Sequence, residues 1–128
     1  MSESANLRYT EDHEWARTNG SEVTVGITAF AVEQLGDVTL VTFDVKVGDA
    51  IARGKAFGTV ESVKTLSDLY APVSGTVVRV NDGLTSHPEL VNADCYGAGW
   101  MLVLAPSEAA SVDALMDEDA YSRHVKAT

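Results

Sequence analysis

Three consecutive residues, Asp12, His13 and Glu14, carry side chains of the types that bind metal ions or act as acids and bases in hydrolysis. Consecutive residues of a β-strand point to alternate faces, so on a strand these three would not converge on one ion. Cys95 is the only cysteine, and it needs a nearby base to act as a nucleophile. The three histidines are scattered, and none stands at metal-ligand spacing from it. The residue types therefore favour neither an enzyme active site nor a metal site.

Lys64 stands alone between two apolar stretches, in the segment 61–71. Glu61 and Asp68 are the charged residues nearest to it. The segment has no Asn-Gly or Asp-Gly pair, so the usual chemistry of a two-residue hairpin turn is missing. Spacing and composition alone favour the simplest interpretation, an ordinary solvated lysine at a hairpin tip.

Short strands surround this segment. Alternating or β-branched apolar residues predict strands near residues 23–27, 41–47, 57–60, 76–80 and 100–104. Turn signals rich in glycine, proline and asparagine separate them. Many short strands with closely spaced turns predict a mainly β fold, a flattened sandwich or barrel.

Two stretches predict helices. The first is residues 28–35, with Thr28 as N-cap and Gly36 directly after the end. The second is a C-terminal helical segment at residues 107–125, with a break near 117–119. Residues 47–51 resemble residues 80–84, which suggests two related halves. No stretch has the composition of a linker, so we expect residues 1–128 to form a single domain.

The chain is acidic, with 19 Asp and Glu against 9 Lys and Arg and a formal net charge of −10 in 128 residues. Such a charge repels nucleic acid and attracts partners with basic docking surfaces, although solubility alone also explains it. One cysteine permits no intramolecular disulfide, which fits a reducing compartment. The longest apolar run is too short for a membrane span, and the N-terminus lacks a secretory signal. We therefore expect a cytoplasmic protein, or one of the mitochondrial matrix if a transit peptide was removed.

Several blocks, in the right order, resemble one family, the H protein of the glycine cleavage system. They are Tyr9-Thr10-Glu11-Asp12-His13-Glu14-Trp15, Val25-Gly26-Ile27-Thr28, Leu35-Gly36-Asp37, Glu61-Ser62-Val63-Lys64, Ala71-Pro72-Val73-Ser74-Gly75, Pro88-Glu89-Leu90-Val91-Asn92 and Tyr96-Gly97 to Gly99-Trp100. The resemblance runs from about Leu7 to Tyr121.

The resemblance implies a flattened β-sandwich of the biotinyl/lipoyl-carrier type with quasi-twofold halves. It makes Lys64 the residue that carries lipoic acid through an amide bond. Glu61, Ser62, Val63 and Thr65 complete the attachment motif. The chemistry then belongs to the cofactor, and the chain is a carrier without catalytic residues.

The implied function is a shuttle. A pyridoxal-phosphate glycine decarboxylase loads an aminomethyl group onto the lipoyl arm, a tetrahydrofolate-dependent aminomethyltransferase removes it, and an FAD dihydrolipoyl dehydrogenase reoxidises the dihydrolipoyl form. A lipoyl or octanoyl transferase or ligase is the further partner that attaches the group, and the carrier itself is expected to be a monomer. Because the loaded arm ends in an amine, the resemblance suggests a protecting cleft with Glu14 and Asp68 as contacts and Asp12 as a weaker candidate.

Two other carrier functions compete with this one. A lipoyl-relay protein would donate its lipoyl group to other acyltransferases, and the same lysine motif would serve it. A biotinyl carrier shares the fold, but biotin sites usually flank the lysine with methionine, whereas Val63 and Thr65 flank Lys64.

Overall fold

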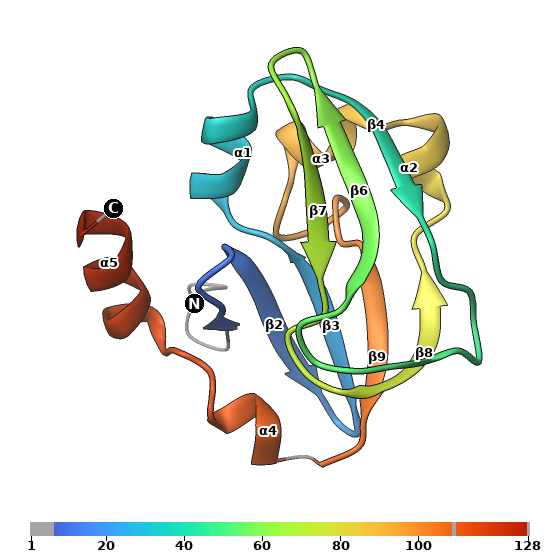
Figure 1. Cartoon of the computed structure of the whole chain (residues 1–128), viewed down its shortest axis with the longest axis vertical. Helices are drawn as coiled ribbons and strands as arrows, with labels where there is room; N and C mark the ends of the chain where they lie inside the picture. Colours follow the sequence, from blue (N-terminus) through green and yellow to red (C-terminus); the bar gives the residue numbers. More distant parts are fainter. Residues whose placement is uncertain (1–6, 109, 128) are drawn as a thin grey trace.

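Two antiparallel β-sheets pack against each other in a sandwich (Figure 1). The computed structural model describes residues 7–108 and 110–127. The six-stranded sheet has the order β1 (Leu7–Tyr9), β2 (Glu14–Asn19), β3 (Glu22–Ile27), β9 (Leu102–Pro106), β8 (Gly75–Val80) and β5 (Ala50–Ile51). The three-stranded sheet has the order β4 (Val38–Phe43), β6 (Ala56–Ser62) and β7 (Leu66–Tyr70). The mainly β sandwich predicted from the sequence is confirmed.

The core lies between the sheets and is built from alternate strand residues. Val23, Val25 and Ile27 on β3 are all buried, as their period-two spacing predicts. They share one apolar cluster with Val60 on β6 and Leu69 on β7, from the opposite sheet. Burying each such side chain stabilises the fold by about 1.5–3 kcal/mol. The sheets are therefore held at a fixed separation beneath the β6–β7 hairpin.

Helix α1 (Ala29–Leu35) begins and ends at the residues that the sequence predicts. The Thr28 hydroxyl accepts a hydrogen bond from the Ala31 N–H (3.2 Å), and Gly36 has a φ of 75°, in the left-handed region that favours glycine. In Figure 1 the β6–β7 hairpin forms the upper tip of the molecule, with α1 beside it. The N-cap and the glycine thus fix the position of α1 next to the hairpin.

The remaining helices are short, apart from the last. They are α2 (Gly83–Ser86), α3 (Glu89–Ala93), α4 (Ala110–Asp113) and α5 (Glu118–Ala127). The expected C-terminal segment is divided at residues 114–117, slightly earlier than the predicted break at 117–119. Tyr121 on α5 stacks on Tyr9 with ring centroids 4.5 Å apart, which attaches α5 to the edge of the six-stranded sheet. No helix in the described ranges is long and apolar enough to cross a membrane.

Three details of the sequence interpretation are wrong. The strand expected at 41–47 ends at Phe43, because Asp49 closes a turn by accepting a hydrogen bond from the Lys46 N–H (3.0 Å). The strand expected from Trp100 starts at Leu102, after a turn in which Trp100 N–H bonds to the Gly97 carbonyl. The similar segments 47–51 and 80–84 lead into a strand and a helix respectively, so their likeness does not extend to conformation.

Candidate functional site

A serine hydroxyl builds the tip of the β6–β7 hairpin. The Ser62 Oγ accepts hydrogen bonds from the backbone N–H groups of Lys64 and Thr65, both at 3.2 Å. The Ser62 N–H in turn donates to the Thr65 carbonyl (2.8 Å). These bonds close the turn without the glycine that a two-residue hairpin needs. Ser62 therefore presents Lys64 at the tip.

Lys64 is exposed, and no described residue forms an ion pair with it. Its neighbours Val63 and Leu66 are also unusually exposed for apolar residues, at 67% and 61%. The stem of Lys64 lies over Gly36, where an added Cβ would be 3.4 Å from the Lys64 Cε. The amine is thus available for covalent modification, while the stem rests on the fold.

A groove of about 310 Å³ begins next to Lys64 and runs between the sheets and α1. Thr65, the neighbour of Lys64, belongs to its lining, and so do Asp12, Glu14 and Asp68. Apolar side chains supply much of the rest, namely Ile27, Phe30, Ala31, Leu35, Val60 and Leu69. The structure therefore brings the three acidic residues expected from the sequence together in one groove with Thr65 of the attachment motif.

Glu14 is a buried carboxyl group at the start of β2, only 2% exposed. Its Oε1 accepts a hydrogen bond from the Thr10 hydroxyl (2.7 Å), and its Oε2 accepts one from the Tyr70 N–H (3.3 Å). Burial raises the pKa of Glu14 from 4.5 to about 7, although both hydrogen bonds act in the opposite direction. Glu14 is thus poised to change its charge near neutral pH.

The other two acids are exposed. Asp68, on β7, accepts a hydrogen bond from the Tyr70 hydroxyl (3.4 Å). Asp12 lies in the turn before β2 and not on a strand, which corrects the strand argument against a shared ion. The described part of the chain contains no group of three or more His, Cys, Asp and Glu residues that could hold a metal ion.

Sequence reasoning missed the role of His13, which closes one wall of the groove. Its φ is 68°, and its Nδ1 lies 2.8 Å from the Tyr121 hydroxyl, which is itself 2.7 Å from the Thr28 hydroxyl. Its ring also lies 4.7 Å from that of Phe30. Burial, together with nearby His124, lowers the pKa of His13. Because His13 and Tyr121 are 108 residues apart, no local pattern announces the contact.

A small β-sandwich with an exposed lysine at a hairpin tip, beside a groove that can receive an extended side chain, defines the class of covalent carrier domains. Residues 7–128 match the family model described as glycine cleavage H-protein. The chain therefore belongs to the glycine cleavage H-protein family.

Individual relatives agree. The chain is 52% identical to a glycine cleavage system H protein of Myxococcus xanthus over 116 residues, which cover 91% of this chain and 89% of that protein. It is 47% identical to the one of Bacillus licheniformis over 126 residues, which cover 98% of each. The crystal structure of an H protein from Mycobacterium marinum matches with a TM-score of 0.85 and 38% identity, covering 94% of this chain and 97% of that one.

As an H protein, the chain is the lipoyl shuttle of the glycine cleavage system and is a carrier without catalytic activity. Its family carries the lipoyl group on a lysine, and its partners are the other proteins of that system. The residues present fit such a group, because an exposed amine stands at the hairpin tip and a groove with an apolar lining starts beside it.

Proposed function

We propose that Lys64 carries the lipoyl group in an amide bond and that residues 1–128 form a single lipoyl-carrier domain. The observation that supports this assignment is the exposed hairpin tip of Lys64 beside the groove. When bound, the lipoyl group supplies a disulfide that can accept a substrate fragment and a pair of electrons. The chain supplies its position and its shelter.

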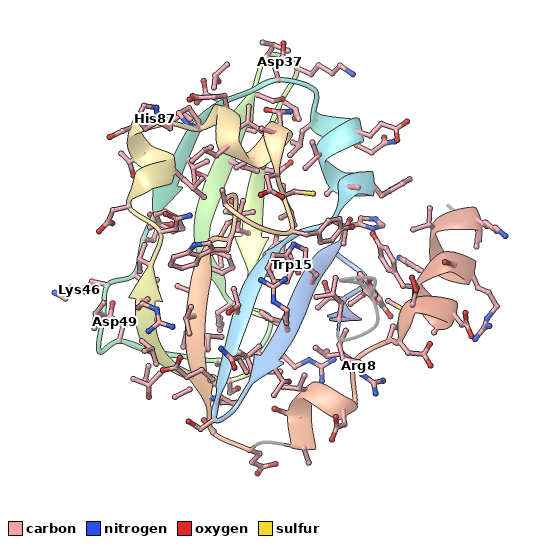
Figure 2. The ribbon with its side chains drawn as sticks, turned by 180° about the vertical axis from the view of Figure 1, so that it is seen from behind. Arg8, Trp15, Asp37, Lys46, Asp49 and His87 are labelled. Atoms are coloured by element: carbon pink, nitrogen blue, oxygen red, sulfur yellow. The ribbon has the colours of Figure 1, made fainter. Side chains whose placement is uncertain are left out.

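Other lysines are poorer candidates. Lys46 follows β4, and Figure 2 shows it on a loop well away from Asp37, which lies at the end of the molecule where the hairpin projects. Lys46 lines a different hollow of about 560 Å³. The lining of this hollow includes one acidic residue, Asp82, whereas the groove beside Lys64 has three. Lys55 lies in the turn before β6 and lines neither.

The proposed partners are the three enzymes of the cycle and the enzyme that attaches the arm. They are a pyridoxal-phosphate glycine decarboxylase, a tetrahydrofolate-dependent aminomethyltransferase, an FAD dihydrolipoyl dehydrogenase, and a lipoyl or octanoyl transferase or ligase. A net charge of −10 suits brief visits, because complementary charge raises the rate of association more than the affinity. A carrier shares a compartment with the enzymes it visits, and the relatives above are bacterial, so we propose the cytoplasm.

The groove is the proposed shelter for the arm. Its acidic residues, Glu14, Asp68 and Asp12, are suited to an amine at the end of the arm, and its apolar residues are suited to the aliphatic part. An exposed amine–carboxylate contact contributes only ~0.2–1 kcal/mol, so docking there is reversible, as a shuttle requires.

Peptide mapping by mass spectrometry tests the assignment. The protein is expressed with lipoic acid and a lipoate ligase, and the modified lysine is identified in wild type, Lys64→Arg and the control Lys55→Arg. We expect one lipoyl group on Lys64, complete loss in Lys64→Arg and no change in Lys55→Arg. A lipoyl group on Lys46 or Lys55 with Lys64 unmodified would overturn the proposal.

A further inference from the structure

The side chain of Asn92, on α3, holds the short link between α1 and β4 from both sides. Its Nδ2 donates a hydrogen bond to the Gly36 carbonyl (2.9 Å), and its Oδ1 accepts one from the Val38 N–H (2.9 Å). One amide group therefore fixes the two residues that flank Asp37. We call residues 36–38 the shelf.

The shelf supports the hairpin tip at two points. The Asp37 carbonyl accepts a hydrogen bond from the Val63 N–H (3.0 Å), next to the modified lysine. A Cβ at Gly36 would lie 3.4 Å from the Lys64 Cε and 3.8 Å from its Cδ, so the lysine stem runs along the bare glycine backbone. The shelf thus restrains both the backbone and the side chain of the tip.

The shelf begins at the end of α1, the helix that lines the groove. Gly36 directly follows α1, and Phe30, Ala31 and Gln34 of that helix line the groove. Phe30 and Ala31 stand four and three residues before Gln34, so these three side chains lie along one side of α1. A lysine stem that rests on Gly36 therefore lies at the end of α1, the helix that forms one wall of the groove.

We propose that Asn92 is a positioning residue for Lys64: through the shelf, it fixes the direction in which the lysine side chain leaves the hairpin. This inference rests on the proposed function of Lys64. The side-chain hydrogen bonds of Asn92 go to Gly36 and Val38, so it acts on Lys64 through the shelf. Losing it leaves the lysine in place but lets its stem and the Val63 backbone move.

The test compares Asn92→Asp with a matched control, Asn81→Asp. Asn92→Asp keeps the side-chain acceptor for the Val38 N–H and loses the donor to the Gly36 carbonyl, so it removes one of the two hydrogen bonds. Asn81 likewise donates from Nδ2 to backbone carbonyls, those of Ala98 (3.0 Å) and Trp100 (2.7 Å), which belong to another turn. Both substitutions remove a side-chain donor to a backbone carbonyl, so a general loss of stability affects both.

Two measurements are made on unmodified protein. Amide hydrogen exchange at Val63 reports the shelf contact, and steady-state kinetics with a lipoate ligase, lipoic acid and ATP report presentation of Lys64. In Asn92→Asp we expect faster exchange at Val63 and a fall in kcat of roughly tenfold, with a smaller change in KM, as for a misdirected reacting group. Asn81→Asp is expected to retain both values. Gly36→Ala, which puts a side chain at a φ of 75° and so strains the shelf, is expected to lower kcat as well.

The outcomes separate this inference from the proposed function. Lipoylation of another lysine in wild type would defeat the assignment of Lys64, whatever the exchange data show. If Lys64 is the lipoylated residue but Asn92→Asp matches Asn81→Asp in kcat, Asn92 has no positioning role and the inference is overturned. Unchanged exchange at Val63 in Asn92→Asp would also overturn it.

Discussion

The carboxylate of Glu14, at the start of β2, accepts a hydrogen bond from the backbone N–H of Tyr70, the last residue of β7 (3.3 Å). This contact joins the six-stranded sheet to β7, the edge strand of the three-stranded sheet in the part of the chain that the structure describes. A buried carboxylate thus holds together the two sides of the proposed shelter while lining it. Glu14 therefore has both a structural contact and a place in the proposed shelter.

The stability of the protein is expected to fall as Glu14 ionises. Its pKa is raised from 4.5 to about 7 in the folded state, so the unfolded chain releases this proton first. Below pH 4.5 both states are protonated, and between pH 4.5 and about 7 the free energy of unfolding falls as pH rises, by about 3 kcal/mol in total. Above that range the loss is complete and constant. Urea denaturation across this pH range measures it.

Glu14→Gln provides the comparison for this pH dependence. Glutamine can accept from the Tyr70 N–H and donate to the Thr10 hydroxyl without a charge. The variant is expected to be more stable than wild type at about pH 8 and close to it at about pH 4.5. Parallel stability curves for the two proteins would show that Glu14 does not titrate as its burial implies.

Gly26 is expected to tolerate no larger residue, because it faces Trp15 across the β2–β3 pair. A Cβ at Gly26 would lie 2.5 Å from Trp15 Cζ2, and the indole is held by the hydrogen bond from its Nε1 to the Cys95 carbonyl (3.0 Å). Figure 2 shows Trp15 against these strands. Gly26→Ala should lower the free energy of unfolding by about 1–3 kcal/mol, the usual cost of overpacking.

A double-mutant cycle with Trp15→Phe identifies the cause. The smaller ring leaves room for the added methyl group, so the cost of Gly26→Ala is expected to shrink in the Trp15→Phe background. Additive effects would attribute the cost to the strand backbone and not to the indole.

Glu61 and Thr65 are expected to matter for lipoylation more than for folding. Glu61 is exposed on β6, three residues before Lys64. It pairs with the exposed Leu40 on β4 and Leu66 on β7. An enzyme that holds the lysine tip reaches these side chains. Glu61→Ala and Thr65→Ala should raise KM for the ligase while changing the free energy of unfolding by less than about 0.5 kcal/mol.

Glu33→Ala is the control for these two variants, because Glu33 is an exposed acid on α1 outside the hairpin. It should leave KM unchanged if the effect is local. If Glu61→Ala lowers the melting temperature as well as the rate of lipoylation, Glu61 instead has a structural role.

Local chemistry explains which parts were predictable. The Thr28 cap, the Gly36 stop and the apolar alternation of β3 each depend on a few neighbouring residues, and the structure has all three. The proposed role of Lys64 rests on the motif around it, since its spacing alone is that of any hairpin lysine. The contacts that give it direction come from far along the chain: Asn92 is 56 residues from Gly36, and no period or turn signal links them.

The end of β4 was missed for a related reason. Val45 continues the alternation of Val41 and Phe43, but the side chain of Asp49 captures the Lys46 N–H and turns the chain. A polar side chain three residues away thus outweighs an apolar pattern. The short helices α2 and α3 carry too few residues to show a helical period.

The shelter proposed for the arm is expected to lengthen the lifetime of its aminomethyl cargo, which hydrolyses in water to formaldehyde and ammonia. The protein is loaded with glycine and a glycine decarboxylase, separated from the enzyme, and followed by the release of formaldehyde. Asp68→Asn should shorten the lifetime by up to about fivefold, the equivalent of one exposed amine–carboxylate contact. Asp44→Asn, which changes an exposed acid outside the groove, is the control and should have no effect.

Because the pKa of Glu14 is about 7, the ratio of lifetimes between wild type and Glu14→Gln should grow as pH rises through that value. Lifetimes that match wild type in both groove variants at every pH would reject the shelter and leave Lys64 as a bare tether.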